Sequence, residues 1–104
     1  MFKIMKARFE VFSEYYGYHY LFEITRQQSG ANKYGDQSAH ILDIFDMNKD
    51  KAHIDWKLYD TRYDSIPTDK NEWVKVWETY IKENWAKVST IKMLSYEEDF
   101  EEYK

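Results

Sequence analysis

Two segments near the N-terminus alternate apolar and polar side chains with the two-residue period of a β-strand. They span residues 5–12 and 18–25. This alternation gives each strand one apolar and one polar face, so the pair is expected to bury one side of a sheet. The residues on the apolar face are Met5, Ala7, Phe9, Val11, Tyr18, Tyr20, Phe22 and Ile24.

The pairing of these two strands can be predicted from their side chains. Placing Val11 opposite Tyr18 aligns the remaining apolar residues and also sets Lys6 opposite Glu23. Apolar matching and charge matching therefore select the same antiparallel register. The sequence predicts a hairpin that closes around residues 14–15.

A second hairpin is predicted from residues 39–46 and 52–59. The second of these strands alternates clearly between two sets of side chains. We expect its apolar set to face the core, and this set is Ala52, Ile54, Trp56 and Leu58. The other set, expected to face solvent, is His53, Asp55, Lys57 and Tyr59.

The connection within this second hairpin begins like a calcium-binding loop, because Asp46, Asn48 and Asp50 place oxygen ligands at every second position. An EF-hand loop requires glycine at its sixth position and a bidentate glutamate at its twelfth. Lys51 and Lys57 occupy those positions here. We therefore interpret the segment as a hairpin turn, which uses the same residue types.

The register of the second hairpin creates a candidate polar site. Pairing Leu42 with Trp56 places Asp43 opposite Asp55 on the outer face, with His53 as a diagonal neighbour. Two carboxylates and an imidazole in contact would suit acid–base chemistry or weak metal binding. The alternative interpretation is a pair of solvated carboxylates without a specific role.

A helix is predicted after Pro67. Asp69 followed by Glu72 forms a capping box, which marks the start of a helix. Apolar residues then recur at helical spacing and share one arc of the helix. They are Trp73, Val74, Trp77, Tyr80, Ile81, Trp85 and Val88.

Residues 88–94 are rich enough in β-branched side chains to add a fifth strand after the helix. The final segment, 96–104, is acidic, and we expect either a solvated tail or a short amphipathic helix. The helical alternative rests on aromatic residues at i, i+4 and i+7. These are Tyr96, Phe100 and Tyr103.

Together these elements predict an α+β fold in one domain over residues 1–95, followed by the acidic segment 96–104. The fold is an antiparallel sheet of four to five strands in the order β-β-β-β-α, with or without a final β. One amphipathic helix is expected to pack on one face of this sheet.

Several functional classes are disfavoured by the sequence. The polar segment 29–38 has the glycine spacing of a phosphate-binding loop, but Asp36 and Gln37 stand where that motif needs Lys and Ser or Thr. We find no catalytic motif and no metal-ligand spacing, so we expect no enzyme activity, no cofactor and no metal. The absence of cysteine and of any apolar run near 20 residues predicts a cytoplasmic protein that does not cross a membrane.

The charge distribution favours a protein partner with a basic surface. The net charge is −4, and acidic groups outnumber basic ones eight to four in residues 36–69 and five to one in residues 96–104. This argues against direct nucleic-acid binding, which needs a clustered positive surface. Carboxylates interspersed with aromatic rings suit contact with basic residues. The predicted partner-binding residues are Asp43, Asp55, Tyr59, Asp60, Arg62, Tyr63, Asp64, Tyr96, Phe100 and Tyr103.

In length, acidity and tyrosine content the chain resembles small phage-encoded inhibitors of host defence enzymes, including anti-CRISPR proteins. This compositional resemblance implies a non-catalytic protein that binds and inhibits a nucleic-acid-handling enzyme, with carboxylates in the positions of phosphates. The carboxylates considered for this mimicry are Asp43, Asp46, Asp50, Asp55, Asp60 and Asp64. Two alternative functions remain: a small-molecule or nucleotide binder with an aromatic pocket, and a toxin-neutralising immunity protein. The sheet face expected to be uncovered also allows docking in a homodimer that hides aromatic residues.

Overall fold

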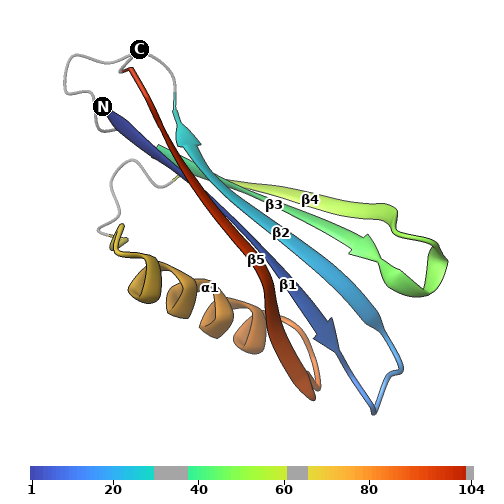
Figure 1. Cartoon of the computed structure of the whole chain (residues 1–104). Helices are drawn as coiled ribbons and strands as arrows, with labels where there is room; N and C mark the ends of the chain where they lie inside the picture. Colours follow the sequence, from blue (N-terminus) through green and yellow to red (C-terminus); the bar gives the residue numbers. More distant parts are fainter. Residues whose placement is uncertain (30–37, 61–65, 103–104) are drawn as a thin grey trace.

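A computed structural model of the chain describes residues 1–29, 38–60 and 66–102, and shows an antiparallel sheet of five strands with one α-helix (Figure 1). The α+β class and the antiparallel sheet predicted from the sequence are confirmed, and the fifth strand is present. In chain order the elements are β1 (Phe2–Phe12), β2 (His19–Gln28), β3 (Ser38–Asp46), the 3-10 turn η1 (Met47–Lys49), β4 (Ala52–Asp60), α1 (Lys70–Asn84) and β5 (Thr90–Glu101). The strand order across the sheet is β4-β3-β2-β1-β5, so β4 and β5 are its two edges.

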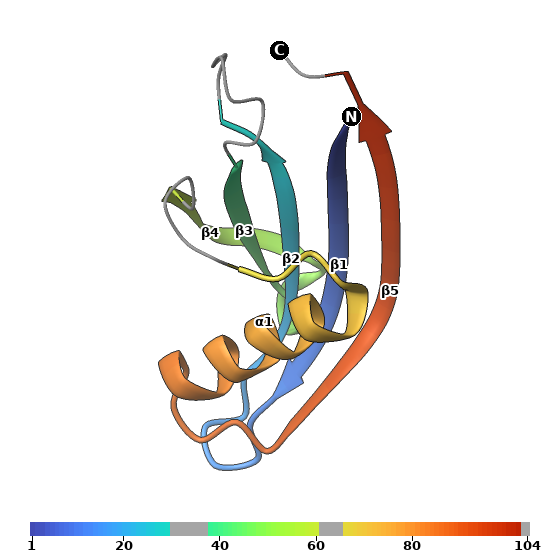
Figure 2. The same cartoon turned by 90° about the vertical axis from the view of Figure 1, so that its left-hand side faces the viewer.

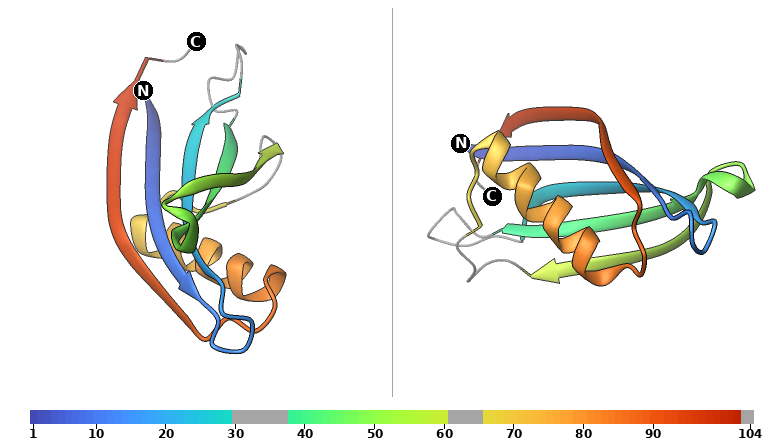
Figure 3. Two further views of the ribbon diagram at one scale, coloured as in Figure 1. Left: turned by 90° about the vertical axis from the view of Figure 1, so that its right-hand side faces the viewer. Right: turned by 90° about the horizontal axis from the view of Figure 1, so that it is seen from below.

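Helix α1 crosses one face of the sheet diagonally, as Figures 2 and 3 show. A helix of 15 residues is about 22 Å long, and five strands span about 19 Å, so one helix reaches from edge to edge. Near the start of the helix, Trp73 contacts Tyr96 of the edge strand β5. Just beyond the end of the helix, Trp85 contacts Phe22 of β2. The ammonium group of Lys57, on the other edge strand β4, lies over the ring of Trp85. We call the covered side the helix face and the other side the open face.

The start of α1 follows the predicted capping signal. The side chain of Asp69 accepts a hydrogen bond from the backbone N–H of Glu72 at 3.3 Å. Asp69 itself has extended backbone angles, as an N-cap residue should. Trp73, Trp77 and Ile81 then follow at helical spacing, and all three are buried.

The first hairpin buries the side chains that its alternation predicts, but in a different register. Val11 lies opposite Tyr20 rather than Tyr18, and Arg8 rather than Lys6 lies opposite Glu23. The reason is a longer turn, which the N–H of Ser13 closes by donating to the carbonyl of Tyr18 at 3.0 Å. Because the displacement is two residues, every side chain keeps its predicted face.

The prediction for β4 is wrong in its facing. A β-bulge inserts Ile54 between the pairs Phe45–His53 and Ile44–Asp55, which shifts the remaining register by one residue. A shift of one residue exchanges the two faces of a strand. Trp56 and Leu58 are therefore 59% and 57% exposed, instead of buried.

The helix face of β4 is formed instead by the set of side chains expected outside. The ring of Tyr59 contacts Trp77 and Tyr80, and the ammonium group of Lys57 lies over the ring of Trp85. The aromatic residues of α1, together with Trp85 just beyond its end, thus accept an amphipathic tyrosine and the ammonium group of a lysine at the margin of the core.

The connection between β3 and β4 is a turn, as predicted. The carboxylate of Asp46 caps η1 by accepting the N–H of Asn48 at 2.9 Å. Asp50 and Lys51 adopt left-handed backbone conformations that reverse the chain. The side chain of Asn48 donates to the carbonyl of Gly17 at 3.1 Å, which ties this turn to that of the first hairpin.

The acidic segment is neither a solvated tail nor a helix over residues 96–101, because it continues β5 along β1. Tyr96 and Phe100 satisfy the helical spacing i and i+4, but residues four apart also share one face of a strand. Ion pairs of Lys3 with Glu98 at 2.9 Å and Arg8 with Glu97 at 3.0 Å join the segment to β1. Pairing with β1 provides both backbone hydrogen bonds and ion pairs for this segment, so the strand is more stable here than a helix or a solvated tail.

Candidate partner-binding edges

The predicted partner-binding residues divide between opposite edges of the sheet. Asp43, Asp55, Tyr59 and Asp60 belong to β3 and β4, whereas Tyr96 and Phe100 belong to β5. Since β4 and β5 are separated by three strands, the two groups do not form one surface (Figure 1). The remaining predicted residues, Arg62, Tyr63, Asp64 and Tyr103, lie outside the described residues.

The candidate polar site is not assembled as predicted. His53 and Asp43 are in contact, with Nε2 and Oδ1 3.0 Å apart. The shift at the bulge places Asp43 opposite Trp56 and Asp55 opposite Ile44, so the two carboxylates are not opposed. The carboxylate of Asp55 instead accepts the N–H of Trp56 at 2.8 Å. Within the described ranges, no group of three or more metal-ligating side chains gathers.

Two of the predicted aromatic residues are already used by the fold. The hydroxyl groups of Tyr59 and Tyr80 are hydrogen-bonded to each other. Tyr96 packs against Trp73 and donates its hydroxyl to Glu98 at 3.0 Å. Burial, together with the nearby Glu98 carboxylate, raises the pKa of Tyr96 to about 12. These rings stabilise the helix face of the sheet.

The end of β5 and the residue that follows it carry five carboxylates within six residues, together with Phe100, which is 52% exposed. We call this segment, residues 97–102, the acidic edge. Glu97 and Glu98 pair with cations of β1, and the hydrogen bond from Lys3 is the main cause that lowers the pKa of Glu98. Among the described residues no ion pair engages the other three carboxylates, which belong to Asp99, Glu101 and Glu102.

The open face is covered by side chains that neutralise one another. Arg8 pairs with both Glu23 and Glu97, and Lys6 also pairs with Glu23. These hydrogen-bonded carboxylates raise the pKa of Arg8. The outer surface of the central strands therefore offers little net charge to a partner, whereas the acidic edge does.

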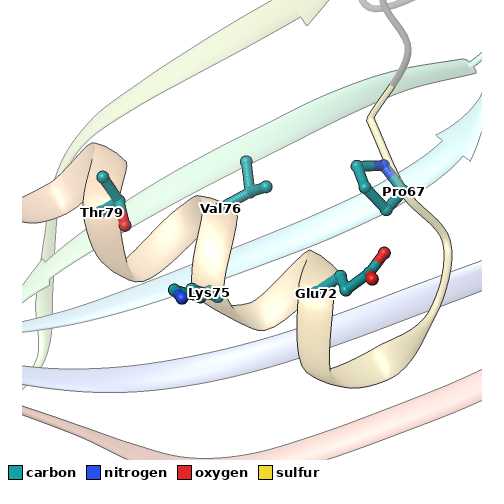
Figure 4. Close-up of a pocket in the computed structure, with 5 residues that line it drawn as sticks. All are labelled: Pro67, Glu72, Lys75, Val76 and Thr79. Atoms are coloured by element: carbon teal, nitrogen blue, oxygen red, sulfur yellow. The ribbon is translucent and has the colours of Figure 1, made fainter.

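A surface hollow of about 580 Å³ lies beside α1 (Figure 4). Its lining residues are Pro67, Glu72, Lys75, Val76 and Thr79. None of them is aromatic, so this hollow is not the aromatic pocket expected for a small-molecule binder. The rings near α1 pack against each other and against the sheet instead, as Trp77 does with His40 and Tyr59.

The structure also exposes apolar residues that the sequence prediction placed in the core. Ile54, Trp56 and Leu58 are all exposed along the edge strand β4. The only sequence signal for this was that both alternating sets of β4 contain large side chains, which leaves its facing undetermined.

Among the described residues, no helix has both the length and the apolar character needed to cross a membrane. Comparison with known proteins gave no matching family model, no matching curated protein and no matching solved structure.

Proposed function

We propose that this protein is a non-catalytic binding protein whose acidic edge occupies a basic surface of another protein and thereby inhibits it. The observation that supports this most directly is the exposed end of β5, where Asp99, Glu101 and Glu102 have no ion pair among the described residues. Unpaired carboxylates at a free sheet edge attract basic partners and steer their approach.

Phe100 gives the acidic edge an apolar anchor. Phe100 is 52% exposed and lies between Asp99 and Glu101 in the chain, whose side chains point to the opposite face of β5 at the same sheet edge. Interfaces commonly combine a buried aromatic residue with a rim of charged groups. We propose that Phe100 inserts into the partner while the carboxylates contact Lys or Arg around it.

The spacing of these charges supports the sharper proposal of a nucleic-acid-handling partner. A β-strand rises about 3.4 Å per residue, and one strand of DNA carries a phosphate about every 3.4 Å along its axis. Asp99, Glu101 and Glu102, the carboxylates of the acidic edge without an ion pair among the described residues, are therefore spaced along the chain within about twofold of the phosphates of one nucleic-acid strand. In this proposal the mimicry belongs to β5, not to the aspartates of the second hairpin.

Affinity capture with matched charge variants tests the proposal. The tagged protein is incubated with lysate of the cells in which it occurs, at low and high salt, and retained proteins are identified by mass spectrometry. We expect one stoichiometric partner that is lost at high salt and competed away by duplex DNA. The triple variant Asp99→Lys, Glu101→Lys, Glu102→Lys should lose this partner.

The control is the triple variant Glu14→Lys, Glu78→Lys, Glu83→Lys, which changes net charge equally but leaves the acidic edge intact. It should retain the partner. Equal retention by both triple variants would place the interface elsewhere and overturn the proposal. A captured toxin, rather than a nucleic-acid enzyme, would indicate the immunity role through the same edge.

A further inference from the structure

Strand β4 is the second edge of the sheet, and no described strand pairs with its outer side (Figure 3). It carries exposed apolar side chains at Ile54, Trp56 and Leu58. An edge strand with free backbone groups and apolar side chains is a template for pairing with another strand. A strand that pairs with β4 must present side chains complementary to these.

The sequence of β4 is complementary to itself when a second copy runs antiparallel about an axis at Trp56. In that register Asp55 lies opposite Lys57 of the second copy, and Lys57 lies opposite its Asp55. Ile54 lies opposite Leu58, and the two Trp56 side chains face each other. Opposite charges and apolar groups are thus matched at every one of these positions.

Neighbouring registers lack this match. An axis at Asp55 would oppose two carboxylates, and an axis at Lys57 would oppose two ammonium groups. Registers centred between residues would pair side chains of the helix face with side chains of the open face. The register about Trp56 is therefore favoured both by charge and by face.

The backbone N–H of Trp56 has a local acceptor that a second strand could replace. It donates to the carboxylate of Asp55, beside it in the chain, at 2.8 Å. In the paired state this N–H would donate to the carbonyl of the opposite Trp56, which releases Asp55 to meet Lys57 of the second copy.

We propose that two copies of this chain associate by antiparallel pairing of their β4 strands about a two-fold axis at Trp56, forming one continuous sheet. A ladder of one strand from each copy is a small contact, so the dimer is expected to depend on concentration. The acidic edges then lie at the two far ends of the sheet. The inference is independent of the proposed partner, because it uses the opposite edge.

A charge exchange tests the register by sedimentation or light scattering over a concentration series. Asp55→Lys and Lys57→Glu should each raise the dimer dissociation constant about tenfold, because two opposed pairs become repulsive. The double variant should restore it to within about threefold. Lys75→Glu, an exposed charge change on α1, should leave it unchanged. Circular dichroism of each variant checks that the fold is retained.

Disulfide trapping tests the axis directly, since the chain contains no cysteine. Hydrogen-bonded antiparallel pairs have Cα atoms about 5.5 Å apart, which suits a disulfide. Trp56→Cys should therefore cross-link to itself, whereas Leu58→Cys should not, because two Leu58 residues would be about 13 Å apart. An equimolar mixture of Ile54→Cys and Leu58→Cys chains should cross-link although neither does alone.

Wild-type protein that remains monomeric at about 1 mM would overturn the inference, since the proposed contact would then be too weak to matter. A dimer whose affinity the double charge exchange fails to restore, or a Leu58→Cys chain that cross-links as readily as Trp56→Cys, would also overturn it. Either result would indicate packing of two open faces instead.

Discussion

Trp73 donates a hydrogen bond from its indole Nε1 to Nε2 of His40, 2.8 Å away, and so links α1 to β3 through the core. His40 is 1% exposed, and its ring also packs against Trp77. Because Nε2 accepts this bond, the imidazole is neutral and carries its proton on Nδ1. Burial, with a smaller effect of the Arg26 charge, lowers the pKa of His40 to about 3.

The depressed pKa of His40 predicts a pH-dependent stability. Between about pH 6.5 and pH 3 the unfolded chain binds a proton at this histidine and the folded chain does not. The stabilisation that the folded protein gains from keeping His40 neutral is therefore complete above pH 6.5. Below pH 6.5 its loss lowers the free energy of unfolding by about 1.4 kcal/mol per pH unit. Urea denaturation at pH 7, 6 and 5 should show this decline in the free energy of unfolding.

The variant His40→Gln identifies the group responsible, because it has no proton to gain in this range. Its free energy of unfolding should change less between pH 7 and pH 5 than that of the wild type. An equal pH dependence in the two proteins would assign the effect to other residues.

The two core tryptophans Trp73 and Trp77 should respond differently to the same substitution. Trp73→Phe removes the donor to His40, whereas the indole N–H of Trp77 is buried and has no hydrogen-bond partner among the described residues. The loss of ring volume is the same in both. We expect Trp73→Phe to cost about 1–2 kcal/mol more than Trp77→Phe in chemical denaturation. Equal losses would show that the bond to His40 contributes nothing net.

The exposure of Trp56 predicts a small effect of its removal on monomer stability. Trp56→Ala should change the free energy of unfolding by less than about 1 kcal/mol, because the ring is already in water. Trp77→Ala should cost about 3–5 kcal/mol through the cavity that it leaves. Denaturation at low protein concentration separates this comparison from dimer formation. A large loss for Trp56→Ala would restore the original assignment of its side chain to the core.

The turn of the first hairpin depends on Gly17, whose φ of 70° lies in the left-handed region. No heavy atom lies within 4 Å of a Cβ placed there, so the cost of a side chain is conformational and not steric. We expect Gly17→Ala to lower the free energy of unfolding by about 1 kcal/mol, and Gly17→Asn by less. If the free energy of unfolding of Gly17→Ala equals that of the wild type, the turn can rearrange to accept the side chain.

The central parts of the fold were predictable because several signals agreed there. In β1 and β2 most of one face is buried, so alternation alone assigns residues such as Phe9 and Phe22 to the core. Asp69 marks the start of α1 by a local bond that requires no distant partner. The exact pairing of the first hairpin was not predictable, since a displacement of two residues leaves every face unchanged.

The candidate site was less predictable because it lies at the two edges. Edge strands bury less of either face, so the alternation of β4 did not reveal which set of side chains faces α1. Phe100 was singled out as an aromatic residue among carboxylates, but its place on a strand depends on the cations that β1 presents. Because the facing of β4 was undetermined, Trp56 was assigned to the core and Tyr59 to the solvent-exposed side, and both assignments were reversed in the structure.

The sequence by itself determined the local elements: which segments are strands, where α1 begins, and which face of the central hairpin is apolar. These features follow from period, capping and turn chemistry, which act within a few residues. Only the tertiary structure decided the bulge at Ile54, the extension of β5 beside Lys3 and Arg8, and the bond between Trp73 and His40. Each of these depends on the free energy of contacts between residues far apart in the chain, and no local pattern encodes that energy.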